Sequence, residues 1–257
     1  MNAMLIDGKA IAEEILVSLE RERNAFGVLT LGLVMGEADA ATESFIKIKS
    51  RAAERLGVEV QRFSPEQFDK ALECSGVIVQ LPLPGGEELL AKLPGAKDLD
   101  ALCPNPLVPA PVAGAVAEIL SRYNLDPKGK KVVVVGAGRL VGVPVATMLK
   151  EYGAEVSVIT QTRGSLDELK PADIVVLGAG EPGLIKPEML KPGVVLIDAG
   201  TSESAGKLAG DADPLCAAVA SIFTPVPGGI GPIAVSMIFK NLFALAKKID
   251  LGKIQGL

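Results

Sequence analysis

The sequence predicts an α/β protein with parallel β-sheet, and three observations support that prediction. Short runs of β-branched residues alternate with longer segments of helical periodicity along most of the 257 residues. One stretch, Lys130–Pro144, has the pattern of a strand, a glycine turn and the start of a helix. Hydrophobic residues make up 49% of the chain, which is enough for a substantial core in one large domain or in two.

The first hundred residues alternate between predicted helices and strands. A helix carries Ile11, Ile15 and Leu19 four residues apart, so one of its faces must be covered. Thr42 is the expected N-cap of the second helix, and Gly57 is its expected stop. The predicted elements after the first helix are a strand over 31–35, a helix to Leu56, a strand over 58–63, a short helix over 65–73, a strand from Gly76 whose last residues include Gln80 and two prolines, and a helix over 87–93.

Lys49 is the first catalytic candidate because of its place on the second helix. At about 100° per residue it shares one narrow arc with Phe45, Ala52 and Leu56, whereas Lys47 lies on the polar side. A cation in the middle of an apolar face is costly unless it is paired, deprotonated or facing a polar cleft. The alternative is that the Lys49 side chain only extends along the helix to water.

Gln80 is the second candidate because it lies among the last residues of the apolar strand that begins at Gly76. In open α/β sheets, ligands bind beyond the carboxyl ends of the strands. The alternative role for Gln80 is to hold the proline loop that begins at Pro82. A rigid, proline-rich connection and a helix over 113–123 then lead to the glycine turn.

The turn Gly136-Ala137-Gly138-Arg139 separates a strand over 132–135 from a helix over 140–149, and a second strand over 155–160 follows. Glycines let the backbone approach a ligand closely, and a helix N-terminus attracts anions. The sequence therefore predicts a Rossmann-like site for a dinucleotide pyrophosphate, with a plain α/β turn as the alternative. The fingerprint is imperfect, because its third glycine is expected at Val141 and Gly142 comes one residue later.

The end of the second strand favours NADP as the cofactor. An NAD site usually places an acidic residue there to bind the ribose 2′-hydroxyl, but this chain has Thr160, Gln161, Thr162 and Arg163. An arginine can bind the 2′-phosphate of NADP. The alternative is that Arg163 is simply a solvated loop residue.

The same alternation continues to the last helix. Strands over 174–177 and 194–197 each run into a glycine-rich turn, and Thr201 follows the second of these at the edge expected to hold the cofactor. A stiff loop containing Pro227, Gly228 and Gly229 then opens a helix over 233–249, whose N-terminus faces a ligand-sized space.

Composition excludes several classes of function. The chain has no histidine, which removes Ser-His-Asp and Cys-His catalysis and the common zinc sites, and no metal site is expected. A net charge of -5 without a basic run, and only 4% aromatic residues, argue against nucleic-acid and membrane partners. No apolar run of membrane-spanning length or signal-peptide core is expected, so the predicted location is cytoplasmic. Three distant cysteines are expected to be small core residues.

Four stretches together resemble the bifunctional methylenetetrahydrofolate dehydrogenase/methenyltetrahydrofolate cyclohydrolase family. They are Ala41–Ala52, Val79–Pro84, Lys97–Asp100 and Thr224–Pro232. The resemblance implies that Lys49 is the key catalytic residue, that Gln80 supports it and that Asp100 holds the pterin. Phe45, Pro227, Gly228 and Gly229 are the further substrate-binding candidates. The cofactor-binding candidates are Gly136, Ala137, Gly138, Arg139, Thr160, Arg163 and Thr201.

The resemblance also implies a homodimer whose subunit has a folate domain and a Rossmann-like NADP-binding domain. We expect residues 1–118 to form the folate domain, completed by a C-terminal helix over 233–257, and residues 119–232 to form the nucleotide domain. The implied activity is oxidation of 5,10-methylenetetrahydrofolate with NADP, followed by hydrolysis of the methenyl product to 10-formyltetrahydrofolate.

The chain departs from the family pattern at several positions. The family usually has tyrosine at Phe45 and histidine at Thr160, Gly-Arg-Ser at Gly136–Gly138, and Pro-Cys-Thr-Pro at Pro109–Val112. Hydride transfer needs alignment more than acid-base groups, whereas hydrolysis needs a proton acceptor, for which Lys49 is the candidate. Two alternatives stay open: a dehydrogenase with weak or lost cyclohydrolase activity, and a noncatalytic NADP-binding module on the same fold.

Overall fold

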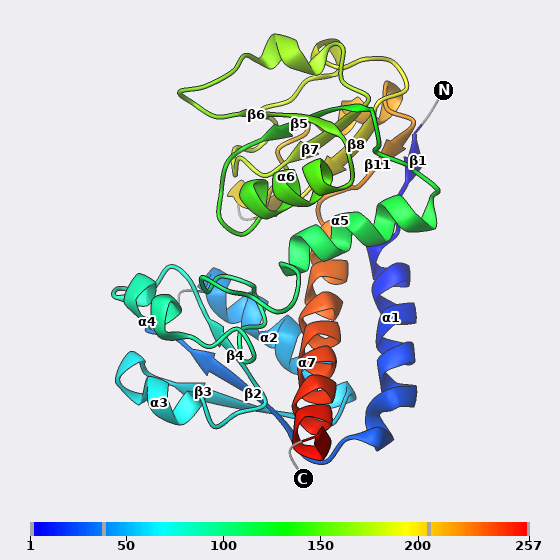
Figure 1. The fold of residues 1–257 in the computed structure, drawn as a ribbon. Helices are drawn as coiled ribbons and strands as arrows, with labels where there is room; N and C mark the ends of the chain where they lie inside the picture. The colour runs from blue at the N-terminus through cyan, green and yellow to red at the C-terminus, as the bar shows by residue number, and fades with distance from the viewer. Residues whose placement is uncertain (1–2, 38–39, 205–206, 256–257) are drawn as a thin grey trace. The chain divides into compact units, whose positions relative to one another are not determined.

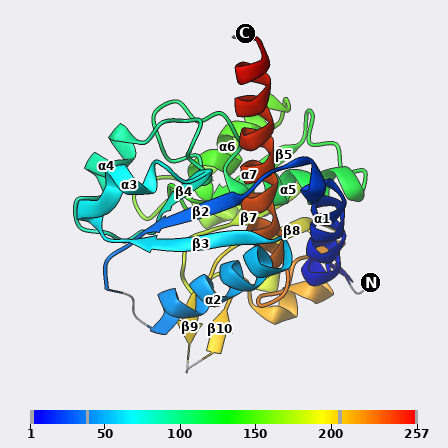
Figure 2. The same ribbon diagram turned by 90° about the horizontal axis from the view of Figure 1, so that it is seen from below.

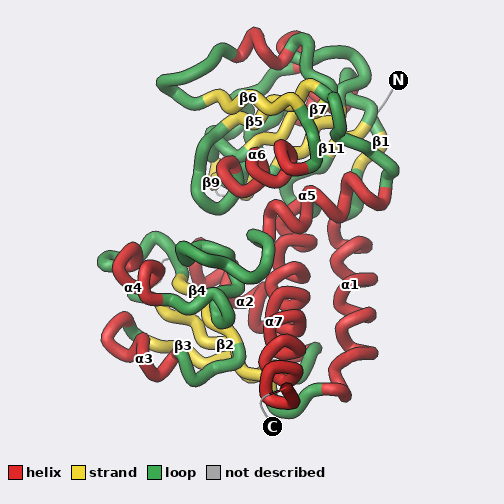
Figure 3. Tube along the Cα trace, viewed as in Figure 1, coloured by secondary structure: helices red, strands yellow, loops and turns green. Residues whose placement is uncertain are grey.

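The computed structural model describes residues 3–37, 40–204 and 207–255 and confirms the predicted α/β class (Figure 1). The chain forms two units, one made of Met1–Ile11 and Val112–Ala234 and the other of Ala12–Pro111 and Val235–Leu257. In the described ranges, each unit has its own parallel sheet, and the first unit also has a short antiparallel hairpin (Figure 3).

The first unit is built on a sheet that has six strands within the described residues, in the order β1-β11-β8-β7-β5-β6. All neighbouring pairs run parallel. The run Val132–Val135 is buried throughout, as expected for a parallel strand covered on both faces. The strand bounds are β1 Met4–Leu5, β5 Lys131–Val135, β6 Glu155–Ile159, β7 Ile174–Leu177, β8 Val195–Asp198 and β11 Ile222–Phe223.

Strand β5 is the point at which the direction of the strand order reverses. The chain leaves β5 through helix α6 (Gly142–Glu151) and returns as β6 on one side, while β7 pairs with the other side of β5. Helix α6 packs over β5 and β6 (Figure 1). Ligands of open α/β sheets bind beyond the carboxyl ends of the strands at such a reversal. A ligand of this sheet is therefore expected at the turn between β5 and α6.

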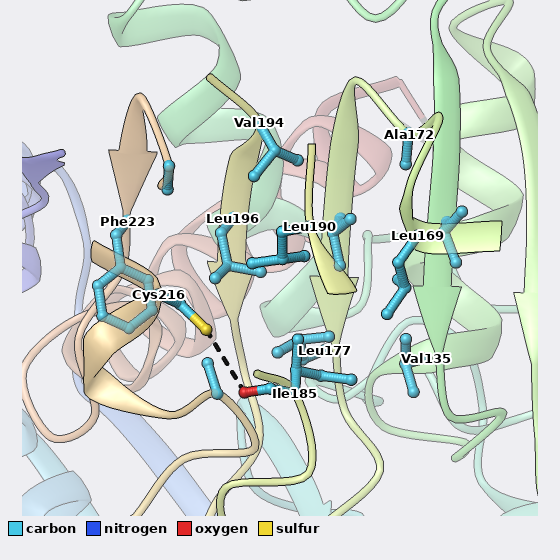
Figure 4. Packing of buried hydrophobic residues seen from close by; sticks show 14 of the residues in the cluster. Val135, Leu169, Ala172, Leu177, Ile185, Leu190, Val194, Leu196, Cys216 and Phe223 are labelled. Atoms are coloured by element: carbon cyan, nitrogen blue, oxygen red, sulfur yellow. Dashed lines mark hydrogen bonds between the residues drawn. The ribbon is translucent and has the colours of Figure 1, made fainter. Parts of the chain in front are cut away.

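A cluster of buried apolar side chains covers one face of this sheet (Figure 4). It joins alternate residues of the strands, such as Val133 and Val135, to Leu169, Ile185 and Leu190 from the connecting segments. Those segments contain the short 3-10 helices η3 Leu166–Leu169, η4 Pro187–Met189 and η5 Pro214–Ala218. Since the side chains of a strand alternate between faces, Val132 and Val134 are buried on the opposite side.

The second unit contains a sheet that, among the described residues, has three parallel strands in the order β3-β2-β4. Helix α2 packs against β3 (Figure 2). It begins at Ala40, so Thr42 lies inside the helix and the predicted N-cap was wrong. The bounds are β2 Leu29–Val34, α2 Ala40–Arg55, β3 Val58–Phe63, η2 Pro65–Gln67, α3 Phe68–Ala71, β4 Gly76–Val79 and α4 Gly86–Lys92.

The division between the units falls within three helices. These are α1 (Gly8–Glu22), which is followed by η1 (Arg23–Ala25), α5 (Pro111–Arg122) and α7 (Ile230–Gln255). The expected division between residues 118 and 119 falls inside α5. The N-terminal residues join the first unit because β1 pairs with β11, and two-residue strands of this kind leave no periodic signal in the sequence.

Helix α7 begins earlier than expected and contains a longer apolar run than expected. It begins at Ile230, three residues before the predicted start at Ile233, and Pro232 fits its first turn because no intrahelical N–H is needed there. The stretch Ile230–Lys247 is long and apolar enough to cross a membrane, so the prediction that no run has this length was wrong. However, 61% of that stretch is buried inside the protein, as in a core helix.

Candidate active site and nucleotide-binding turn

Lys49 lies on the buried side of α2, among Ile46, Ala53 and Leu56, which are all nearly inaccessible to water. Its own side chain is half-buried. The Nζ atom donates a hydrogen bond of 2.8 Å to Oε1 of Gln80. The Lys49 amine therefore donates to a neutral side-chain acceptor of the protein and does not interact with water alone.

Gln80 is held by the end of strand β4, which it directly follows. Its backbone N–H donates to the carbonyl of Val34 at 2.9 Å, and its Nε2 donates to the carbonyl of Leu81 at 3.2 Å. Since the amide nitrogen is engaged with Leu81, the amide oxygen faces Lys49. Gln80 thus both fixes the start of the proline loop and serves as partner to the lysine.

Asp100 is the third polar residue of this group. Burial raises the pKa of its carboxyl above the ordinary value of 3.8; the charge of Lys49 opposes that rise, and the Asp98 carboxylate adds to it. The net direction is upward, so the protonated form is favoured relative to an exposed aspartate. Lys49, Gln80 and Asp100 therefore form one polar group in the second unit, which we call the Lys49 cluster.

Asp98 holds the loop that carries Asp100, a role that the sequence did not reveal. Its side chain is 1% exposed and accepts hydrogen bonds from the backbone N–H groups of Asp100 at 3.0 Å and of Leu102 and Cys103 at 2.6 Å. On the other side of the loop, Nδ2 of Asn241 in α7 donates to the carbonyls of Leu99 and Pro109, each at 2.9 Å. The available signal for Asn241 was a single amide side chain within the apolar stretch Ile230–Lys247.

The remaining substrate candidates are not gathered at the Lys49 cluster by any described contact. Phe45 lies in α2 one turn before Lys49, and its side chain is outside the described residues. Pro227, Gly228 and Gly229 belong to the first unit. There Gly8 donates to the carbonyl of Gly228 at 2.9 Å, and a Cβ on Gly8 would lie 1.7 Å from the carbonyl oxygen of Gly229.

The turn between β5 and α6 depends on two glycines for its shape. Gly136 has a φ of 100°, and a Cβ there would lie 2.3 Å from the carbonyl oxygen of Gly178. A Cβ on Gly142 would lie 2.0 Å from the carbonyl oxygen of Gly136. Gly142 therefore provides the close backbone approach that the fingerprint assigns to a glycine one residue earlier. Helix α6 begins at Gly142 and not, as predicted, at Leu140.

Gly138 differs from both, because a Cβ on it would meet nothing within 4 Å. Ala137, Gly138 and Arg139 are all exposed. A backbone that is uncovered and lacks a side chain at Gly138 leaves room for a ligand, and the N-terminus of the ten-residue helix α6 supplies the positive end of its dipole. These residues fit a dinucleotide pyrophosphate.

The end of β6 lies beside this turn, since the N–H of Gly136 donates to the carbonyl of Ile159 at 2.8 Å. Thr160 and Arg163 then close a tight turn, in which the N–H of Thr160 donates to the carbonyl of Arg163 at 2.8 Å. Arg163 is exposed at the same edge of the sheet as Gly136. Thr201, also exposed, follows β8 at this edge.

Two buried carboxylates that the sequence did not identify as site residues lie behind the turn. Asp198 ends β8 and is 1% exposed, and Asp211 follows the hairpin β9 Ser202–Ser204 and β10 Lys207–Ala209 and is 0% exposed. Burial, together with the neighbouring Asp211, raises the pKa of Asp198 to about 6, although backbone N–H donors oppose the shift.

The cysteines are buried and unpaired, as predicted. Burial raises the pKa of the Cys216 thiol to about 11, and its Sγ donates to the carbonyl of Ile185 (Figure 4). In the described ranges, no group of three or more histidine, cysteine, aspartate or glutamate side chains is placed to hold a metal ion.

Comparison with known families and sequences gives one consistent result. The model of the tetrahydrofolate dehydrogenase/cyclohydrolase NAD(P)-binding domain matches residues 110–250. The bifunctional protein FolD of Staphylococcus epidermidis is 33% identical, over 98% of this chain and 99% of that protein.

Solved structures agree with the sequence comparison. The bifunctional FolD methylenetetrahydrofolate dehydrogenase/cyclohydrolase of Campylobacter jejuni superposes with a TM-score of 0.89 at 28% identity, covering 96% of this chain and 99% of that one. The enzyme of the same name from Trypanosoma brucei, solved with NADP and an inhibitor, gives a TM-score of 0.87 at 31% identity, covering 96% and 98%.

Proposed function

Because this chain belongs to the tetrahydrofolate dehydrogenase/cyclohydrolase family, we propose that it catalyses two consecutive reactions of one-carbon metabolism. The first is oxidation of 5,10-methylenetetrahydrofolate to the 5,10-methenyl cation with NADP as hydride acceptor. The second is hydrolysis of that cation to 10-formyltetrahydrofolate. Family membership supports dehydrogenase and cyclohydrolase activity on tetrahydrofolate derivatives. It does not decide between NAD and NADP, and NADP is our proposal.

The observation that carries the proposal is the 2.8 Å hydrogen bond from Lys49 to Gln80. Water attack on the methenyl cation releases one proton, which a nearby base must accept. An amine that donates one N–H to the Gln80 oxygen keeps its lone pair for that proton when it is uncharged. Lys49 therefore acts as the base and Gln80 orients it.

Further residues of the chain bind the substrate in our proposal. The Asp100 carboxyl binds the pterin, whose ring N–H groups are donors that suit carboxyl oxygens. Phe45, one helical turn before Lys49, is a further substrate-binding residue in our proposal. Pro227, Gly228 and Gly229 complete the substrate-binding set in our proposal.

The oxidation step requires alignment of two reactants more than acid-base catalysis. A nicotinamide supplies the hydride-accepting ring when it is bound. The chain's part is to hold the pyrophosphate at Gly136, Ala137, Gly138 and Arg139, with Thr160 and Thr201 at the same sheet edge. This division of tasks suits a protein without histidine.

NADP is preferred over NAD in our proposal because of Arg163. Its exposed guanidinium follows β6, where an acidic residue would otherwise bind the ribose 2′-hydroxyl. We expect a higher kcat/KM with NADP. Equal or better turnover with NAD would refute this preference and would assign the ribose to Thr160 and Gln161.

The second candidate function is a dehydrogenase with weak or lost hydrolysis, favoured by phenylalanine at position 45, where the family usually has tyrosine. A noncatalytic NADP-binding module is less well supported, because the Lys49 cluster would then have no task. We further propose that the protein is soluble and cytoplasmic and has no nucleic-acid or membrane partners. We also propose that it is a homodimer, which size-exclusion chromatography with light scattering would test.

Two separate assays test the proposed function. Purified protein with methylenetetrahydrofolate and NADP should form NADPH, and methenyltetrahydrofolate without any nicotinamide should be hydrolysed faster than in buffer. Oxidation without hydrolysis would leave the second candidate. Neither activity, with NADP still bound, would leave the noncatalytic module.

A further inference from the structure

The buried carboxylates of Asp198 and Asp211 accept hydrogen bonds from the backbone of the loops at the carboxyl edge of the sheet. Asp211 accepts from the N–H groups of Ala179 at 2.6 Å, Gly180 at 3.2 Å and Glu181 at 2.8 Å. Asp198 accepts from Gly200 at 2.9 Å, from Asp211 at 3.2 Å and from Ala212 at 2.8 Å. The Asp198 carboxylate thus holds the backbone of Asp211 in place, and the Asp211 carboxylate in turn holds the loop 178–181.

Both carboxylates are tightly enclosed by glycine backbone. A Cβ on Gly200 would lie 2.2 Å from the carboxyl carbon of Asp211, and a Cβ on Gly210 would lie 2.2 Å from Oδ2 of Asp198. Burial and the neighbouring Asp211 disfavour the charged form of Asp198, and backbone N–H donors oppose that effect. A neutral amide could not replace either carboxylate without loss, because its NH₂ group would face a backbone N–H.

The loop 178–181 forms one wall of the nucleotide-binding turn. The carbonyl of Gly178 would lie 2.3 Å from a Cβ on Gly136, and a Cβ on Gly178 would lie 2.4 Å from Cγ1 of Val141. On the opposite side, the Ser202 hydroxyl donates to the carbonyl of Gly180 at 2.7 Å. The loop is therefore held through its N–H groups by Asp211 and through a carbonyl by Ser202, and any shift of the loop moves the wall of the turn.

We propose that Asp198 and Asp211 are positioning residues for the nicotinamide cofactor, which set the loop 178–181 against the glycine turn so that the pyrophosphate is received in one geometry. The inference rests on the proposed binding of NADP at this turn. It assigns to this carboxylate pair a contribution to cofactor affinity, exerted through the backbone and without contact between either carboxylate and the cofactor.

The test compares three single variants for their NADP dissociation constant. In Asp211→Asn, one carboxylate oxygen becomes an NH₂ group that faces a backbone N–H, so the loop loses a charged acceptor. We expect NADP to bind about tenfold more weakly or worse. Ser202→Ala removes the second tether, and we expect about a three- to tenfold loss, in line with one neutral hydrogen bond. Asp213→Asn is the matched control, because Asp213 caps η5 and pairs with Lys186 instead of holding the loop.

The KM for NADP should rise in the first two variants while the KM for the folate stays near the wild-type value, a split that a general loss of stability would not produce. If folded Asp211→Asn binds NADP as tightly as wild type, the inference is wrong. If Asp211→Asn does not fold, Ser202→Ala decides in the same way. Wild-type protein that does not bind NADP would instead refute the proposed function.

Discussion

In the unit with the three-stranded sheet, the candidate site consists of side chains: a lysine, an amide and a carboxyl meet although they lie far apart in the sequence. In the unit with the six-stranded sheet, it consists of backbone, and glycines are required because a Cβ would lie 2.0 to 2.3 Å from a carbonyl oxygen. The first kind of site loses a reacting or binding group when one side chain changes. The second kind of site loses the shape of its backbone when a glycine changes.

The largest effect is expected for Lys49→Met, which keeps the apolar length and removes the amine. Hydrolysis of methenyltetrahydrofolate should fall by about 10²- to 10⁴-fold, the usual contribution of a general base. Lys47→Met is the control, because Lys47 is exposed on the same helix. Equal hydrolysis by wild type and the Lys49→Met variant would show that the lysine only extends to water.

Asp198 should make stability depend on pH in the nucleotide-binding unit. Its pKa is raised from 3.8 to about 6, so the folded state keeps a proton that the unfolded chain loses between these values. The unfolding free energy should therefore fall as pH rises from about 4 to about 6, by up to about 3 kcal/mol, and then stay level. The negative charge of the neighbouring Asp211 contributes to this raised pKa of Asp198.

Asp198→Asn isolates this contribution, since it cannot titrate. The difference in unfolding free energy, wild type minus variant, should be smaller at pH 7 than at pH 4.5 in urea titrations. The same difference at both pH values would show that Asp198 does not keep its proton in the folded state.

Phe45→Tyr should improve the side-chain site. A hydroxyl one helical turn before Lys49 can bond the amine or the substrate, and a hydrogen bond to a charged or reacting group contributes about 1.5 to 3 kcal/mol, or about one to two decades in rate. We expect hydrolysis to speed up more than oxidation. An unchanged ratio of the two rates would mean that the hydroxyl is not the missing element.

The smallest effects are expected for alanine in the glycine turn, where two positions should behave differently. Gly142→Ala forces a Cβ into the Gly136 carbonyl and should lower the unfolding free energy by about 1 to 3 kcal/mol. Gly138→Ala meets open space, so thermal unfolding should barely change while NADP affinity falls. The account of the turn fails if Gly138→Ala binds NADP as wild type does.

The elements that the sequence predicted correctly are those with a long or periodic apolar pattern. The unit of β5, α6 and β6 is one example, because four consecutive valines run into a glycine turn. Strands β1 and β11 have two residues each and exist only through pairing with neighbours. The hairpin of β9 and β10 was likewise not expected.

The candidate sites divide in the same way. Lys49 and Gln80 could each be selected from local pattern, one from the apolar helix face and the other from the end of a strand, but their hydrogen bond joins residues 31 positions apart. Asp211 acts through backbone N–H groups 30 to 32 residues away, which only the folded loops bring together. No spacing in the sequence encodes those contacts, so tertiary structure was needed to find them.

The most direct test of the central claim, that one chain oxidises and then hydrolyses its folate, is a time course that follows NADPH and methenyltetrahydrofolate together. The wild-type protein would start from methylenetetrahydrofolate and NADP. We predict that NADPH accumulates, while methenyltetrahydrofolate rises briefly and then stays below it because hydrolysis removes it. Methenyltetrahydrofolate that equals NADPH throughout, after subtraction of hydrolysis in buffer, would contradict the hydrolytic half, and the absence of NADPH would contradict the whole account.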